Sequence, residues 1–278
     1  MGKKYGYCAL CGKYGELSFE HIPPKSAFNK APVKPVTGKT WLSSPNALPW
    51  DLNNLPYVHL QKGMGLWSLC KKCNNFTGTM YGTAYRDFAE SIAKTVEITI
   101  KTGDKGVEIS QCYPLRIVKQ ILSMFCSVNP SNMFDLDDLR AFVLDKDAVG
   151  IDRKKYQLQM YFLKNNMMKF NGFSAVIKFD PTTGSLQQSS LVSEITAFPL
   201  GFLLYLNPDP TQEYEGVDIT PFASFHYEDM GCIRLPIEIK EVNNIFPLDY
   251  RSKEEIIKTM NENKKFNQPQ QREEENNE

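Results

Sequence analysis

Two C-x2-C pairs constrain the fold of this chain more than any other feature. Cys8 and Cys11 form the first pair, Cys70 and Cys73 form the second, and 58 residues lie between the two pairs. Each pair places two sulfur atoms on one tight turn, and two such turns supply the four ligands of a tetrahedral zinc site. The spacing therefore predicts a structural zinc ion that closes a long loop and brings distant parts of the chain together.

Two disulfides, or four unrelated buried thiols, are the alternative interpretations of these cysteines. Disulfides need an oxidising compartment, and the first residues, Met1-Gly2-Lys3-Lys4, lead into no apolar signal segment. No apolar run approaches the length of about 18 residues that a membrane helix needs. We therefore expect a cytoplasmic protein with reduced cysteines and no membrane partner.

The formal net charge of zero conceals an asymmetry along the chain. Residues 1–75 contain ten lysines and three acidic residues, a net charge of +7, so residues 76–278 carry a net charge of −7. A basic part beside an acidic part is typical of a polyanion-binding module that is joined to a second unit. A solvated surface covered with lysines is the alternative.

Hydrophobic periodicity predicts an α+β fold. Apolar residues at helical spacing predict helices at about 80–94 and from Pro114 to Asn129. Alternating apolar residues predict a β-hairpin at 96–109. From about residue 155 onward the alternation predicts a mostly antiparallel sheet, including the apolar run Leu191–Leu206, which Pro199 bends into two strands.

We expect this pattern to divide the chain into three parts. Residues 1–95 form a zinc-bearing domain, which includes a long irregular connection at 22–65. Residues 96–260 form a second, mostly antiparallel α+β domain. Residues 261–278, which are rich in Asn, Gln and Glu, form a disordered tail.

The candidate catalytic residues lie between and beside the cysteine pairs. Glu20-His21 follows the first pair, and Asn74 directly follows the second. Carboxylate and amide oxygens are suitable ligands for Mg²⁺ or Mn²⁺, and a neutral imidazole can take a proton from water. Phosphodiester hydrolysis needs such a cation and such an activated water. The alternatives are a core histidine at 21, a lysine-paired Glu20 and an Asn74 that caps a helix.

These residues resemble the HNH endonuclease superfamily, whose core is a ββα-metal fold. The matching segments are Glu20 to Ser26, which reads Glu-His-Ile-Pro-Pro-Lys-Ser, and Leu69 to Gly78, which reads Leu-Cys-Lys-Lys-Cys-Asn-Asn-Phe-Thr-Gly. The resemblance covers about residues 5–92. It implies an N-terminal ββα-metal domain with a four-cysteine zinc site.

The resemblance also implies roles for individual residues. His21 would be the general base, and Glu20 and Asn74 would ligate a catalytic Mg²⁺ or Mn²⁺. Apart from the resemblance, the lysines in these segments are either contacts for nucleic-acid phosphates or ordinary solvated side chains; they are Lys25, Lys71 and Lys72. The middle Asn of the family is replaced here by Gly65. Its scaffolding role passes either to Asn46, Asn53 or Asn54 of the long connection or to no residue.

The function that this resemblance implies is metal-dependent hydrolysis of DNA, in an architecture similar to restriction and anti-phage defence effectors. Residues 96–260 would then recognise, recruit or regulate through a protein partner, self-association or a small-molecule activator. The alternative is a non-catalytic zinc module that binds nucleic acid or a protein partner. A nuclease should hold tight zinc and need an additional exchangeable divalent ion, whereas a binding module should need zinc alone.

Overall fold

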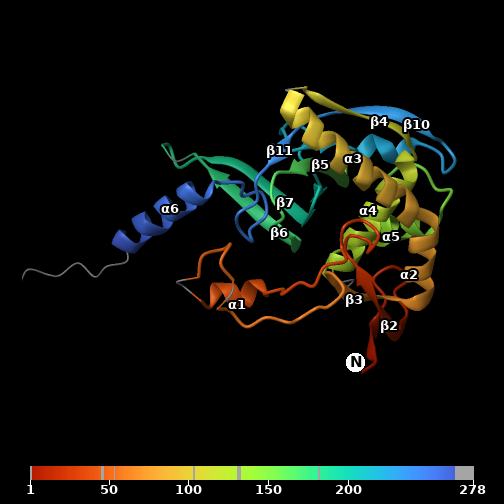
Figure 1. Cartoon of the computed structure of the whole chain (residues 1–278), viewed down its shortest axis with the longest axis horizontal. Coiled ribbons are helices and arrows are strands. Elements are labelled where there is room, and N and C mark those ends of the chain that lie inside the picture. Colours follow the sequence, from red (N-terminus) through yellow and green to blue (C-terminus); the bar gives the residue numbers. More distant parts are fainter. Residues whose placement is uncertain are drawn as a thin grey trace, which may run out of the picture.

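Figure 1 shows the computed structural model of the chain, which describes residues 2–44, 47–52, 54–102, 104–129, 133–180 and 182–266. The helices, with a π-helical turn η1 and a 3-10 turn η2, are α1 Gly38–Leu42, α2 Lys71–Thr77, η1 Gly78–Gly82, α3 Thr83–Thr102, α4 Pro114–Val128, α5 Asp137–Leu144, η2 Thr220–Ser224 and α6 Lys253–Phe266. The strands are β1 Lys4–Tyr7, β2 Tyr14–His21, β3 Gly65–Cys70, β4 Gly106–Cys112, β5 Tyr156–Leu163, β6 Lys169–Phe179, β7 Leu186–Ala197, β8 Leu200–Leu206, β9 Val217–Asp218, β10 Gly231–Pro236 and β11 Ile239–Lys240.

Within the described ranges, the strands form three sheets. The first has the order β1-β2-β3, the second pairs β4 with β10, and the third has the order β11-β5-β8-β7-β6, with β9 also paired to β5. Every pairing is antiparallel except that of β11 with β5. The prediction of an α+β fold with mostly antiparallel sheets is therefore confirmed, and the bent run at Pro199 separates β7 from β8 as expected.

Helix α3 is longer than its sequence pattern predicts, and the predicted hairpin at 96–109 is wrong. The chain stays helical to the end of α3, so the alternation of Val96, Ile98 and Ile100 does not mark a strand. Val96 is buried because it continues the apolar stripe of the helix, four residues after Ile92. Strand β4 pairs instead with β10, near the other end of the chain.

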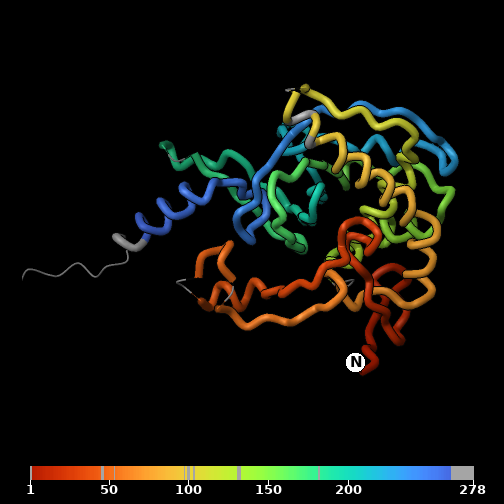
Figure 2. Tube along the Cα trace, viewed as in Figure 1, coloured from red at the N-terminus to blue at the C-terminus, as the bar shows by residue number. Residues whose placement is uncertain are grey.

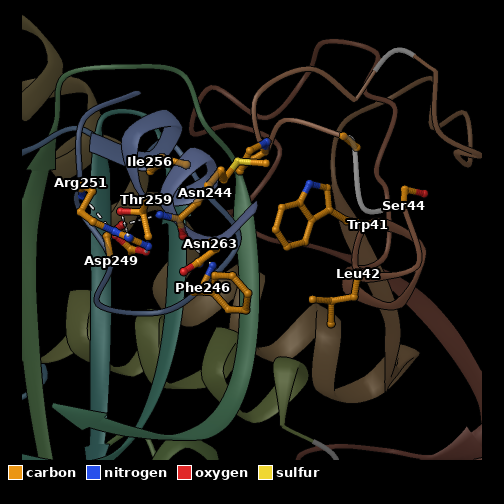
Figure 3. Close-up of a pocket in the computed structure, with 13 residues that line it drawn as sticks. Trp41, Leu42, Ser44, Asn244, Phe246, Asp249, Arg251, Ile256, Thr259 and Asn263 are labelled. Atoms are coloured by element: carbon orange, nitrogen blue, oxygen red, sulfur yellow. Dashed lines mark hydrogen bonds and ion pairs between the residues drawn. The ribbon is translucent and has the colours of Figure 1, made fainter. Parts of the chain in front are cut away.

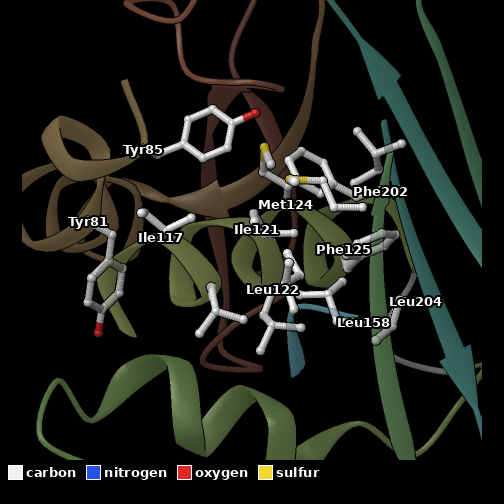
Figure 4. Packing of buried hydrophobic residues seen from close by; sticks show 14 of the residues in the cluster. Tyr81, Tyr85, Ile117, Ile121, Leu122, Met124, Phe125, Leu158, Phe202 and Leu204 are labelled. Carbon is white, nitrogen blue, oxygen red and sulfur yellow. The ribbon is translucent and has the colours of Figure 1, made fainter. Parts of the chain in front are cut away.

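Helix α4 forms the centre of the hydrophobic core, and its predicted position is confirmed. Figure 4 shows its apolar side chains between Tyr81 and Tyr85 on one side and residues of β5 and β8 on the other. The ring of Tyr85 lies 6.2 Å from that of Phe202 on β8, measured between centroids. The same cluster of buried residues includes Leu69 of β3 and also Cys8 and Ile22, which directly follow β1 and β2. One core therefore joins the first sheet to the rest of the molecule.

The expected domain boundary at residue 95 lies inside α3, and the three-part division stays a prediction. Residues 261–266 continue α6, and residues 267–278 lie outside the described part of the chain. None of the helices within the described ranges is both long enough and apolar enough to cross a lipid bilayer.

The connection from β2 to β3 is irregular, as its composition predicts. In Figure 2 it leaves the first sheet, runs to α1 and returns to β3. Its outgoing and returning arms pair at Val33 and Leu60, whose backbones exchange hydrogen bonds of 2.9 and 3.0 Å. The long connection is therefore a loop whose outgoing and returning segments are hydrogen-bonded to each other.

Candidate metal centre and active site

The four cysteines of the two C-x2-C pairs meet in space, as their spacing predicts. Their sulfur atoms all lie within 4.8 Å of one another, and the Cys11 and Cys70 sulfurs are 3.9 Å apart. A tetrahedral zinc site with Zn–S bonds of about 2.3 Å separates its sulfurs by about 3.8 Å. All seven cysteines are free in this structure, which contains no disulfide between them. The cluster could hold a metal such as zinc.

Backbone geometry builds each cysteine turn. The first pair occupies the turn between β1 and β2, where Gly12 adopts φ +68° and donates its N–H to the Cys8 carbonyl over 2.9 Å. The second pair lies where β3 ends and α2 begins, and the Cys70 N–H points at the Cys8 sulfur at 3.3 Å. Such N–H groups stabilise a thiolate, as a bound cation would also do.

Proton sharing within the cluster shows how strongly the thiols interact. A hydrogen bond from Cys73 lowers the pKa of Cys8 to about 4, and the same contact raises the pKa of Cys73. Without a cation, one negative charge on Cys8 therefore disfavours ionisation of its neighbour. A bound zinc ion would remove this conflict, because it would stabilise all four thiolates together.

Helix α5 supports the first cysteine turn from far along the chain. The Arg140 guanidinium is almost fully buried, and its Nε donates to the Ala9 carbonyl over 3.0 Å. Asp137 holds the same guanidinium through a 2.6 Å contact. No sequence pattern marks Arg140, because its partner is a backbone carbonyl 131 residues away.

Glu20 lies on β2, and Asn74 of α2 packs against the same strand. Glu20 is 5% exposed, and among the described residues no side chain donates a hydrogen bond to it, so burial raises its pKa to about 8. Ser18 shares its face, because side chains two apart on a strand point the same way. The Asn74 amide donates to the Ser18 hydroxyl over 3.0 Å and to the Phe19 carbonyl over 3.3 Å. Asn74 is therefore hydrogen-bonded to β2 at Ser18 and Phe19, the two residues that precede Glu20.

His21, the last residue of β2, points to the opposite face. Its ring lies edge-on to Phe19, with ring centroids 5.1 Å apart, and its Nε2 lies 3.0 Å from the Lys62 carbonyl. Burial lowers the pKa of His21, the hydrogen bond to Lys62 opposes this effect, and the nearby charge of Lys25 lowers the pKa further. The imidazole is therefore neutral near pH 7, and Nδ1 carries the free lone pair when Nε2–H donates to the carbonyl.

His21 lines a hollow of about 410 Å³. The other lining residues come from β2, β3 and the returning arm of the long connection. They are Phe19, His59, Leu60, Gln61, Lys62, Gly63 and Trp67. His59 was not a predicted site residue, because nothing in the sequence near it suggests a partner. The fold brings it to the same hollow as His21.

Asn29 fastens the two ends of the long connection together. Its side chain is 2% exposed and donates to the carbonyls of Pro23 and Met64, while its oxygen accepts the Met64 N–H, each over 2.7 Å. Gly63 must be glycine beside it, since a Cβ there would lie 2.2 Å from the Asn29 carbonyl oxygen. This clamp sets the position of the Lys62 carbonyl that holds His21.

The sequence favours other asparagines of this connection for a scaffolding role, namely Asn46, Asn53 or Asn54. Asn54 is exposed, and Asn46 and Asn53 lie outside the described residues. Asn29 makes the bridging contacts instead, and only its three-way geometry distinguishes it from the other asparagines of the segment.

We expect Asn29→Asp to destabilise the protein by about 1–3 kcal/mol, because two buried carbonyls lose their donor and face a carboxylate oxygen. Denaturant titration of the free energy of unfolding measures this effect. Asn54→Asp is the matched control on the same connection, and an exposed site should change by less than about 0.5 kcal/mol. Equal stability of the two variants would show that the clamp contributes nothing.

The far end of the long connection contacts the C-terminal segment. Trp41 and Phe246 both line a hollow of about 270 Å³, which Figure 3 shows. Their rings are in edge contact, with centroids 5.7 Å apart. The Lys253 ammonium lies 5.5 Å from the centroid of the Trp50 ring. The Arg251 charge in this hollow is already paired with Asp249 at 2.6 Å. These contacts hold the far end of the long connection, around Trp41 and Trp50, against the C-terminal segment.

Lys25, Lys71 and Lys72 are exposed, so the three predicted phosphate contacts are accessible to a ligand. Among the described residues, the four cysteines are the only group of His, Cys, Asp or Glu side chains close enough to hold a metal ion together. Comparison of the chain with protein-family models, curated proteins and solved structures finds no match.

Proposed function

We propose that this chain is a metal-dependent endonuclease of the HNH type that hydrolyses DNA phosphodiester bonds. The observation that carries the proposal is that the cysteine cluster joins the turn before β2 to the end of β3 and the start of α2, and that β2 carries the Glu20-His21 pair at its other end. Two antiparallel strands followed by a helix are what the resemblance to the ββα-metal fold implies. The +7 charge of residues 1–75 suits a polyanionic substrate.

The residues proposed to hold the catalytic divalent ion fit that role chemically. The Glu20 carboxyl is buried without a donor among the described residues, which is a costly arrangement unless a cation or a proton compensates it. The Asn74 amide nitrogen is engaged by β2, so its oxygen is the atom left for a ligand. A bound Mg²⁺ or Mn²⁺ would supply positive charge to a non-bridging phosphate oxygen.

In the proposed reaction, the scissile phosphate lies at the end of β2, beside His21. The neutral imidazole takes a proton from the attacking water through Nδ1, while the Lys62 carbonyl fixes the ring through Nε2. The edge of Phe19 keeps one side of the ring in an apolar environment, which favours the neutral base.

A plasmid cleavage assay tests the proposal most directly. The purified protein should convert supercoiled DNA to nicked or linear forms with Mg²⁺ or Mn²⁺, and a chelator that leaves the tight zinc in place should stop the reaction. Cleavage that is unaffected by removal of exchangeable divalent ions, or no cleavage with either ion, would contradict the proposed function.

Two exposed lysines at the start of α2 lead to a prediction about DNA affinity. The double variant Lys71→Ala, Lys72→Ala should reduce the slope of log affinity against log salt concentration by about 2, since each lysine that neutralises a phosphate contributes about one unit. Sequence preference should not change, because phosphate contacts do not read bases. Fluorescence anisotropy over a salt series measures the slope.

Lys154→Ala, Lys258→Ala is the matched control for this experiment, because both lysines are exposed and lie outside the basic segment. It should leave the slope unchanged. If the two double variants behave alike, the DNA-binding face lies elsewhere.

A further inference from the structure

We propose that His59 is a second catalytic residue of the proposed nuclease site and donates a proton to the oxygen that leaves the phosphorus. This inference rests on the proposed function. It starts from the hollow of about 410 Å³ that His59 and His21 line together. A hollow of this size accommodates a nucleotide-sized group, since ligand pockets usually measure about 300–1,000 Å³.

His59 is held in place although it lies on an irregular segment. Leu60, the next residue, exchanges two backbone hydrogen bonds with Val33 on the outgoing arm. Val58, the preceding residue, donates its N–H to the Pro35 carbonyl over 3.2 Å. Both neighbours of His59 are therefore hydrogen-bonded to the outgoing arm, and these bonds fix the backbone that carries the imidazole.

The two imidazoles are oriented by different nitrogens. The Gln61 amide lies 3.2 Å from Nδ1 of His59, which leaves Nε2 of His59 for a ligand. The Lys62 carbonyl occupies Nε2 of His21, which leaves Nδ1 of His21 as the base. The Gln61 amide nitrogen donates to Nδ1 of the neutral ring. A half-turn of the amide group places its oxygen there instead, and this oxygen accepts from Nδ1–H of the imidazolium, so Gln61 can orient His59 in both protonation states.

The lining of the hollow favours His59 as the proton donor. The described residues around it include no carboxyl group, tyrosine or cysteine, and the charged neighbour is Lys62. Imidazole is the side chain that releases and regains a proton most readily near neutral pH. A base and an acid are both needed when water replaces an alkoxide.

The proposed step balances as follows. The water oxygen forms a bond to phosphorus, and its proton passes to Nδ1 of His21. The bond between phosphorus and the leaving oxygen breaks, and that oxygen takes the Nε2 proton of the His59 imidazolium. Both rings return to their starting states by proton exchange with solvent, so the reaction consumes only water.

Bridging sulfur substitution in the substrate separates proton donation from binding. One oligonucleotide carries the natural oxygen at the leaving position, identified from the ends of the wild-type product, and its twin carries sulfur there. A thiolate leaves without a proton, so a general acid no longer matters. Single-turnover rates are measured for the wild type, His59→Asn, His59→Gln and the control His226→Asn, an exposed histidine on another turn.

We expect both His59 variants to cleave the oxygen substrate about 100-fold or more slowly than the wild type and the sulfur substrate within about threefold of it. His226→Asn should match the wild type on both substrates. Zinc content and thermal midpoint confirm that each variant is folded.

An equal loss on both substrates, or no loss on the oxygen substrate, would overturn the role of His59 and leave the proposed function standing. Failure of the wild-type protein to cleave the oxygen substrate would instead overturn the proposed function, and the inference with it.

Discussion

His21→Ala is expected to abolish DNA cleavage while the zinc content and the fold remain unchanged. A general base contributes about 10²–10⁴-fold to a rate, so the residual activity should fall below about 1% of the wild-type value. The ring lies outside the cysteine cluster and makes one hydrogen bond, to the Lys62 carbonyl, so its removal should cost only about 1 kcal/mol of stability.

The measurement is the single-turnover rate on plasmid or oligonucleotide DNA at saturating Mg²⁺ or Mn²⁺. His226→Ala is the matched control, because His226 is exposed and lies on a turn in the second half of the chain. Cleavage by His21→Ala at the wild-type rate would remove the imidazole from the mechanism, even if the protein remained a nuclease.

Cys70→Ser should have the largest effect on folding, because it should lose zinc and unfold the first sheet. The Cys70 sulfur lies 3.9 Å from that of Cys11, and the residue stands where β3 ends and α2 begins. Structural zinc contributes about 10–16 kcal/mol in small zinc domains, which is as large as the whole net stability of many proteins. Loss of one ligand therefore removes an interaction that local packing cannot replace.

Zinc content per chain and hydrogen exchange over residues 4–77 measure this outcome. Cys232→Ser is the control, because Cys232 is an exposed free cysteine outside the cluster. A Cys70→Ser protein that is stable, free of zinc and active would exclude the structural metal site.

Helices and strands could be predicted where one periodic pattern dominates. The apolar repeat of α4 and the apolar runs of β7 and β8 are each long enough to define their element, and all three are confirmed. The end of α3 could not be predicted in this way. Three apolar residues at alternate positions fit a strand locally, but Val96 is placed by the helical stripe that precedes it, and the partner of β4 is β10 rather than a neighbouring strand.

The candidate site, too, could be predicted from the sequence only in part. The cysteine cluster followed from ligand spacing, since two tight turns with two sulfurs each satisfy one tetrahedral ion. The positions of Glu20 and His21 on opposite faces of β2 follow from the period of a strand. The contribution of His59 could not be predicted, because no short pattern links it to His21 across the long connection.

The sequence alone determined the α+β class, the cysteine cluster and the choice of Glu20, His21 and Asn74 as candidate residues, because these depend on local periodicity and on the chemistry of side chains at short spacing. Only the tertiary structure decided how those residues are supported. Arg140 reaches the Ala9 carbonyl, and Asn29 clamps Pro23 to Met64, through hydrogen bonds to backbone groups. Every residue offers such groups, so these partners are selected by how the chain closes in space rather than by residue type.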